Sequence, residues 1–187
     1  PEAAIVDAAV PLNTLQPAID ENNLSPKILL VTHTHFDHTE NLDEYASAFP
    51  DAEVCVTGGR GRWSNERSLS DGDTIEIGTL TVTTLHTPGH TEDSSCFLAE
   101  DTLFSGDTIF VGRTGRTISA ESDTRQLYRS ISGKLLTLPG DTVIYPGHDY
   151  GPVQMISLKE NIAMSPLLQA TDEDDFVKRM DDYERSR

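Results

Sequence analysis

The sequence predicts a mixed α/β fold in which two β-sheets pack face to face and helices cover them. Short runs of aliphatic and β-branched residues recur along the whole chain, some separated by single amphipathic stretches and others joined by tight turns. No internal repeat, low-complexity block or linker rich in Pro, Gly or Ser divides the sequence. We therefore expect one domain that spans residues 1–187.

The strands are predicted from apolar runs that end at turn residues. Five such runs are residues 4–6, 28–32, 54–56, 80–85 and 142–145. Turn residues at 71–73 and 77–79 frame a further strand over 74–77, so 69–86 is predicted to form a meander. Glu100 and Asp101 connect 97–99 to 102–104 in a predicted hairpin.

Three helices are predicted from apolar spacing and capping residues. The first ends at Pro50, the second begins after Asp123, and the third begins with a capping box of Thr171 and Asp174. Their inward-facing residues are Leu42, Tyr45, Ala46 and Phe49, then Leu127, Ile131 and Leu135, then Phe176, Met180 and Tyr183. We interpret the acidic run 172–175 as a solvated first turn that matches the helix dipole.

The chain carries 31 acidic and 14 basic residues, which gives a net charge of −17. Such a surface repels nucleic-acid phosphates and anionic lipids, so neither nucleic acid nor a membrane is an expected partner. No apolar run approaches the ~20 residues of a membrane helix, and no signal peptide is visible, which favours the cytoplasm. Only 4 of the basic residues are lysines, a composition that favours a halophilic protein over an ordinary acidic one.

Two cysteines, Cys55 and Cys96, lie in apolar, strand-like stretches and form no CxxC pair. We expect small buried hydrophobic residues there rather than reactive thiols, since free cysteine is among the most buried residue types. This usage is compatible with a reducing compartment.

Three of the six histidines fall in a His-x-His-x-Asp-His run, residues 33–38, directly after the apolar strand 28–32. Imidazoles two residues apart on an extended segment, His33 and His35, point the same way and can chelate one ion. The side chains of Asp37 and His38 are expected to point toward a position next to that ion. Imidazole nitrogen together with carboxylate oxygen suits zinc, iron or manganese.

Three more residues of ligand type, His90, Asp107 and His148, each follow a glycine where a predicted strand runs out into a loop. A single histidine is commonly a surface or packed residue, but this pattern favours one metal cluster. His86 lies within a strand, so we expect it to be structural and to fix the loop to His90 by a hydrogen bond.

These motifs, His33-Thr34-His35-Phe36-Asp37-His38 with the Gly-His, Gly-Asp and Gly-His steps that follow, resemble the metallo-β-lactamase superfamily. The resemblance implies a four-layer αβ/βα sandwich with the metal site at one edge between the sheets. It also implies two divalent ions, most simply zinc, with iron or manganese as alternatives. The implied ligands are His33, His35 and His90 for the first ion, Asp37, His38 and His148 for the second, and Asp107 as a bridge.

Within that superfamily, segments 112–117, 127–131, 138–142 and 145–150 resemble glyoxalase II (hydroxyacylglutathione hydrolase) and the related persulfide dioxygenases. Three departures stand out. Ile118 replaces an acidic residue that is common in such relatives, and few residues follow His148. Relatives also carry strands before the segment equivalent to 3–7, so we expect truncated N-terminal strands and an exposed sheet edge.

Two mechanisms fit one ligand set. In a hydrolase, two metals that share Asp107 generate hydroxide, which attacks a thioester carbonyl. Asp37 is then catalytic as a ligand of the second metal, and Tyr150 donates a hydrogen bond to the substrate unless it is a buried core tyrosine. In a dioxygenase, the resemblance implies a single Fe(II) held by His33, His90 and Asp107. Further alternatives are a lactone or phosphoester hydrolase and a non-catalytic relative that binds a partner.

Arg113 and Arg116 are candidate contacts for a substrate carboxylate, because the guanidinium offers a planar fork of donors. The alternative is that they form salt bridges that hold their loop. The expected substrate is a small thiol-derived molecule, and the sequence carries no signal for oligomeric state.

Overall fold

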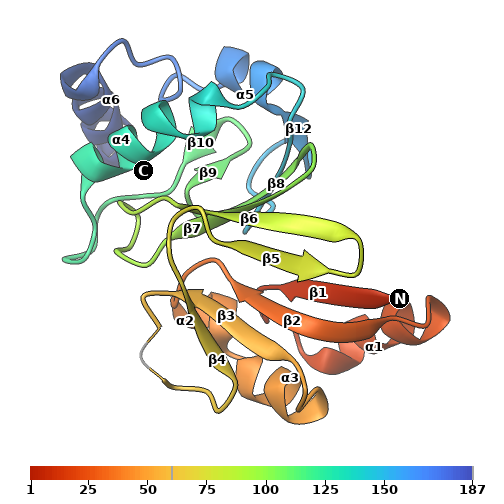
Figure 1. The fold of residues 1–187 in the computed structure, drawn as a ribbon. Helices are drawn as coiled ribbons and strands as arrows, with labels where there is room; N and C mark the ends of the chain where they lie inside the picture. Colours follow the sequence, from red (N-terminus) through yellow and green to blue (C-terminus); the bar gives the residue numbers. More distant parts are fainter. Residues whose placement is uncertain (60, 187) are drawn as a thin grey trace.

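Two main β-sheets form the centre of the computed structural model, which describes residues 1–59 and 61–186 (Figure 1). The first sheet is entirely parallel, with strand order β1-β2-β3-β4. Its strands are β1 (Glu2–Val6), β2 (Ser25–Val31), β3 (Glu53–Thr57) and β4 (Glu66–Leu69). The order of the second sheet is β12-β11-β8-β7-β6-β5.

The second sheet is mixed. Strand β11 runs parallel to β8, whereas every other pair of neighbouring strands described in this sheet is antiparallel. Its strands are β5 (Thr74–Ile77), β6 (Leu80–His86), β7 (Ser95–Ala99), β8 (Thr102–Gly106), β11 (Val143–Pro146) and β12 (Ile156–Ser157). A small hairpin of β9 (Ile109–Phe110) and β10 (Arg113–Thr114) follows β8.

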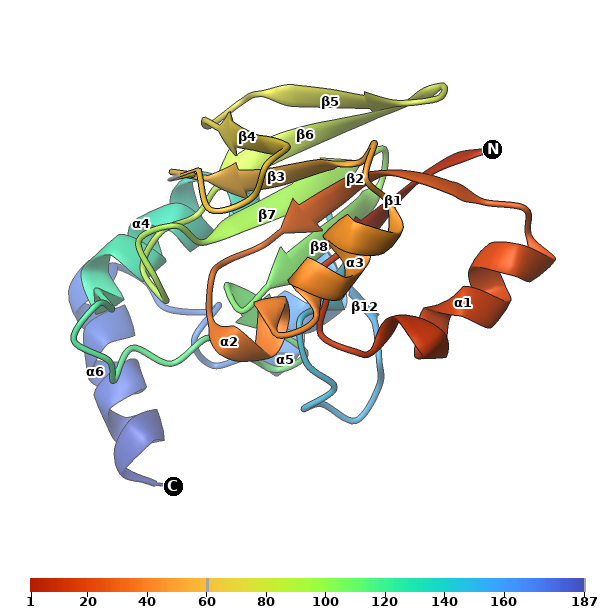
Figure 2. The same ribbon diagram turned by 90° about the horizontal axis from the view of Figure 1, so that it is seen from below.

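Helices cover the outer faces of both sheets (Figures 1 and 2). The first sheet carries α1 (Leu12–Glu21), α2 (Phe36–Thr39) and α3 (Leu42–Ala48), and the second carries α4 (Thr124–Gly133), α5 (Leu158–Met164) and α6 (Glu173–Arg185). A short 3-10 helix, Leu135–Thr137, follows α4. The predicted four-layer α/β sandwich is confirmed.

Three apolar clusters fill the spaces between these layers. Alternation along β2 shows the principle: Ile28 and Leu30 pack between the two sheets, whereas Leu29 and Val31 pack under the helices of the first sheet. In the second sheet, Phe97 faces the inter-sheet cluster and its neighbour Cys96 faces the helices on the other side. Both faces of the central strands β2 and β7 are therefore buried, which explains why β2 appears in the sequence as an uninterrupted apolar run.

The predicted strands and helices are confirmed, with one correction at a helix end, since α4 ends at Gly133 and Leu135 lies in the 3-10 helix, and one at a helix start. Asp172, not Thr171, is the N-cap of α6, since its side chain accepts a hydrogen bond from the Asp175 backbone N–H at 2.9 Å. Thr171 instead donates its own backbone N–H to the Asp175 carboxylate at 3.0 Å. The acidic first turn of α6 is present as expected.

Several elements were not predicted from the sequence, among them α1, β4 and α5. Helix α1 contains Pro17 and has no side-chain cap, and β4 buries only Leu69, so neither shows the periodicity that identifies such elements. Helix α5 begins with a capping box of Ser157 and Glu160, a signal that the sequence does contain. Among the described residues, no helix has the length and apolar character needed to span a bilayer.

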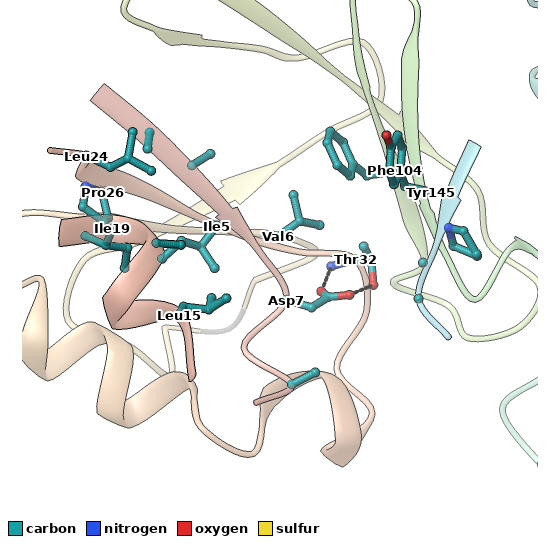
Figure 3. Close-up of a pocket in the computed structure, with 17 residues that line it drawn as sticks. Ile5, Val6, Asp7, Leu15, Ile19, Leu24, Pro26, Thr32, Phe104 and Tyr145 are labelled. Carbon is teal, nitrogen blue, oxygen red and sulfur yellow. Dashed lines mark hydrogen bonds between the residues drawn. The ribbon is translucent and has the colours of Figure 1, made fainter. Parts of the chain in front are cut away.

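Strand β1 has β2 as its only neighbour among the described strands, so one of its edges is unpaired, as predicted. A cavity of about 470 Å³ runs along this edge (Figure 3). Its walls include Ile5 and Ile19 on one side and Phe104 and Tyr145 on the other. The cavity is mainly apolar, and none of the six histidines lines it.

Candidate metal centre

Four strands of the two sheets end at one edge of the sandwich. Strands β6, β8 and β11 run in the same direction, because β6 and β8 are both antiparallel to β7 and β11 is parallel to β8. The loops after their carboxyl ends carry His90, Asp107 and His148. A hydrogen bond of 2.8 Å from the Ser95 N–H to the Thr32 carbonyl joins the end of β2 to this edge, so the residues after β2 reach it too.

The first group of side chains consists of His33, His35 and His90, here called the first triad. His33 Nε2 lies 3.0 Å from His35 Nδ1, which in turn lies 3.1 Å from His90 Nε2. Three ring nitrogens thus converge on one point and could hold one metal ion. Burial, assisted by the nearby His38, lowers the pKa of His33 to about 2, so this imidazole is neutral, the form that binds metal.

The second triad is Asp37, His38 and His148. The Nε2 atoms of His38 and His148 are 3.3 Å apart, and Asp37 Oδ2 lies 3.2 Å from His148 Nε2 and 4.0 Å from His38 Nε2. This geometry offers two nitrogens and one carboxylate oxygen to a second ion.

Asp107 lies between the two triads. Its Oδ2 is 3.6 Å from His90 Nε2 and 3.7 Å from His148 Nε2, while Oδ1 is 3.3 Å from His38 Nε2. Oδ1 is buried and lacks a well-oriented hydrogen-bond donor among the described residues. A buried carboxylate oxygen without a well-oriented donor is costly, so the donor set fits a cation that this oxygen would bind.

Two glycines keep space open around this carboxylate. A Cβ atom on Gly147 would lie 2.6 Å from Asp107 Oδ1 and 2.7 Å from His38 Cε1, closer than real Cβ atoms come. A Cβ on Gly115 would collide with the Asp107 backbone carbonyl. The glycine before His148 is therefore needed because the backbone passes directly against the cluster.

Asp7, at the end of β1, contacts the cluster from behind and was not predicted to do so. Its Oδ2 lies 2.8 Å from His38 Nδ1 and accepts from Thr32 Oγ1 at 2.8 Å, while Oδ1 accepts from the Thr32 N–H at 2.8 Å. Although burial opposes protonation of His38, its contacts with Asp107 and Asp7 raise its pKa to about 10. The available signal was a lone carboxylate directly after the predicted strand 4–6, since His33, Asp107 and His148 also lie within two residues of a strand end.

Two backbone contacts involve the loop that carries the candidate ligand His90. His90 Nδ1 lies 2.8 Å from the carbonyl oxygen of Arg116, so this nitrogen donates and Nε2 faces the cluster. His86 Nε2 lies 2.8 Å from the Glu92 carbonyl oxygen. His86 thus closes the loop that carries His90, in line with the structural role expected of it.

Tyr150 is 54% exposed, which excludes the alternative of a buried core tyrosine. Its ring stacks on that of His148, with centroids 4.8 Å apart and an interplanar angle of 16°. Arg113 lies over the same ring and donates hydrogen bonds to the Tyr150 carbonyl and the Tyr183 hydroxyl, so its guanidinium is engaged within the chain. The exposed Arg116 side chain, by contrast, has no ion-pair partner in the described part of the chain.

A sequence profile of the metallo-beta-lactamase superfamily matches residues 2–148, which include both triads and Asp107. The chain belongs to this superfamily. The hydroxyacylglutathione hydrolase of Francisella philomiragia is 36% identical over 134 residues, 71% of this chain and 53% of that protein. The mitochondrial persulfide dioxygenase ETHE1 of Bos taurus is 32% identical over 155 residues, 80% of this chain and 59% of that protein.

The crystal structure of ETHE1 from Myxococcus xanthus is 30% identical, with a TM-score of 0.86 over 96% of this chain and 80% of that chain. The fold and the enzyme superfamily are thereby established. The chain spans less than two thirds of the length of the two curated relatives.

Proposed function

We propose that this protein is a metal-dependent thioester hydrolase of the hydroxyacylglutathione hydrolase type. The observation that carries the proposal is the arrangement of the seven ligand-type residues into two complete triads with Asp107 between them. A mononuclear centre needs only three of these side chains, whereas a pair of ions would use all of them. The hydrolase relatives support the same activity.

Two divalent ions bound here would lower the pKa of bound water and polarise the thioester carbonyl. The chain itself supplies orientation. Asp7 and the Arg116 carbonyl hold the rings of His38 and His90 by their Nδ1 atoms, so each ring presents Nε2 to the cluster. The stacked and exposed Tyr150 has a hydroxyl that can donate to the substrate.

The proposed substrate is a small thiol-derived ester that carries a carboxylate. Arg116 supports this, because its guanidinium is exposed and unpaired in the described structure and follows the hairpin beside the cluster. Arg113 is a weaker candidate for substrate contact, since Tyr150 and Tyr183 already accept its hydrogen bonds. With a net charge of −17, the remaining surface would repel an anionic substrate, which makes this local positive charge important.

The proposal includes three features of the protein's setting. Two buried free cysteines agree with a reducing cytoplasm. The acidic, lysine-poor composition supports adaptation to high salt. Zinc is the metal proposed first, with iron or manganese compatible with the same nitrogen and oxygen ligands.

The second candidate is an iron-dependent persulfide dioxygenase. The observation in its favour is the likeness to the two ETHE1 proteins. In that case His33, His90 and Asp107 would hold a single Fe(II), and the remaining triad residues would be dispensable for metal binding.

Metal analysis combined with the Asp37→Ala variant separates these candidates. A hydrolase should hold about two ions per chain, cleave an acyl-glutathione thioester, and lose one ion and most activity in Asp37→Ala. The exposed Glu40, which has no side-chain partner in the described structure, makes Glu40→Ala a matched loss of charge on the same segment. A single iron, oxygen uptake driven by a persulfide, and an active Asp37→Ala variant would instead establish the dioxygenase.

A further inference from the structure

We propose that the last turn of α6 positions the metal-binding histidines from outside the cluster. It does so through two series of contacts, here called arms, one to each triad. The proposal rests on the proposed function, because it assumes that both triads bind ions. The arms start from Tyr183 and Glu184, consecutive residues near the carboxyl end of α6. Both residues are only partly exposed, and they contact β10 and the segment that follows it.

The first arm runs from Glu184 to His90. Glu184 Oε1 accepts a hydrogen bond of 2.9 Å from the Thr117 backbone N–H. Thr117 follows Arg116, whose carbonyl oxygen lies 2.8 Å from His90 Nδ1. A histidine ligand depends on such a contact at its other nitrogen for its tautomer and ring orientation. Glu184 therefore holds in place the backbone that orients His90.

The second arm runs from Tyr183 to His148 through two side chains. Arg113 Nη1 donates to the Tyr183 hydroxyl at 3.3 Å, and Nη2 donates to the Tyr150 carbonyl. The Arg113 guanidinium carbon lies 4.9 Å from the centroid of the Tyr150 ring, and the same ring stacks on that of His148 with centroids 4.8 Å apart. A cation–π contact and a ring stack thus connect the helix to a ligand of the second triad.

Helix α6 is a firm support because it is attached along its whole length. Phe176 and Met180 are 1% exposed and belong to the core cluster beneath the second sheet. At its other end Glu173 accepts from both Arg125 and Arg129 of α4, which lies beside α6 in both views of the fold (Figures 1 and 2). Loops alone would leave the two histidines more mobile than this helix does.

Two variants break the arms separately. Glu184→Ala removes the acceptor for the Thr117 N–H, whereas Glu184→Gln keeps an amide oxygen in the same place and should retain wild-type metal binding. Tyr183→Phe removes only the hydroxyl and keeps the ring that packs against the core. Asp182→Ala is the matched control, because Asp182 is exposed on the same turn and has no partner within the described residues.

The readout is metal binding, which does not require catalysis. Zinc affinities from competition with a chromogenic chelator should weaken by about 3–10-fold for one ion in each variant, less than the roughly 10–100-fold typical when a group touching the ligand itself is removed. In cadmium-113-loaded protein, Glu184→Ala should shift one resonance and Tyr183→Phe the other. Asp182→Ala and Glu184→Gln should leave both resonances in place.

The inference is overturned if the wild-type protein binds two ions and neither variant changes affinity or resonances, or if Asp182→Ala changes them equally. It is also overturned if both variants shift the same resonance. Should Glu184→Ala fail to fold, Tyr183→Phe decides alone, since it retains the packed ring. A wild-type chain that binds no second ion would instead refute the proposed function, which is a separate result.

Discussion

Replacing Asp7 by Asn tests how far the metal centre depends on a carboxylate that was not visible as part of the motif. Asp7 accepts from the Thr32 backbone and hydroxyl and from His38 Nδ1, all at 2.8 Å. An amide has one oxygen and no charge, so it cannot satisfy all three donors. Asn is the suitable substitution because Asp7 has a φ of 55°, a conformation that Asn tolerates better than Ala.

The expected loss of zinc affinity follows from the burial of Asp7 and from the charge of its contact with His38. The Asp7 side chain is 9% exposed, so solvent screens its contact with His38 little. A hydrogen bond to a charged group contributes about 1.5–3 kcal/mol. Zinc affinity should therefore fall about 10–100-fold, as expected for a partner that orients a ligand histidine.

The pH dependence has a definite sign in the metal-free protein. The folded pKa of His38 is raised to about 10 from 6.5, by Asp107 and Asp7 against the effect of burial. Its contribution to stability is full below pH 6.5, still large at pH 7, and lost as the pH rises through 10. Asp7→Asn should consequently destabilise the metal-free protein more at pH 7 than at pH 10.5.

Chelator competition gives the zinc affinity, and urea unfolding at the two pH values gives the stability. Asp73→Asn serves as a control, because Asp73 accepts from the Ser70 N–H at 2.8 Å in a turn outside the metal cluster. It should lower stability without changing zinc affinity. An Asp7→Asn variant that binds zinc within about twofold of the wild type would refute the reasoning.

Four further predictions concern other parts of the chain. Burial raises the pKa of both Cys55 and Cys96 to about 11 from 9.0, so a thiol reagent at pH 8 should label neither in the native state and both in urea. Because these thiols ionise at lower pH in the unfolded chain than in the folded protein, the free energy of unfolding should fall as the pH rises above 9. Gly147→Ala should abolish tight binding of the second ion by calorimetry, because its Cβ would meet Asp107 Oδ1 at 2.6 Å; an unchanged stoichiometry would contradict this. Thioesterase activity should rise with ionic strength if the protein is adapted to salt, and a flat or falling profile would exclude that adaptation. Ala3→Lys should reduce concentration-dependent association in size-exclusion chromatography, because it places a charge on the unpaired edge of β1; association unaffected by the substitution would mean that another surface is responsible.

The sequence alone predicted the sheets and the candidate ligands because their signals are local. A buried strand such as 28–32 shows itself as an apolar run, and His33, His35 and His38 follow it within six residues. The isolated candidate ligands could be identified as well, since a glycine precedes each of His90 and His148 at a strand end. Helix α1 and strand β4 were not predicted, because tertiary contacts rather than their own periodicity stabilise them.

What the sequence determined by itself is the type and order of the candidate ligand residues, because chelation and backbone approach impose short spacings. Only the tertiary structure decided which groups orient them. Asp7 lies 31 residues from His38, and Glu184 lies 67 residues from Thr117, and no local pattern joins such pairs. Likewise Arg113 looked free to bind a carboxylate, yet the packing of α6 brings Tyr183 to it. Contacts of this kind depend on where the sheets and helices meet, which is set by the packing of the whole chain.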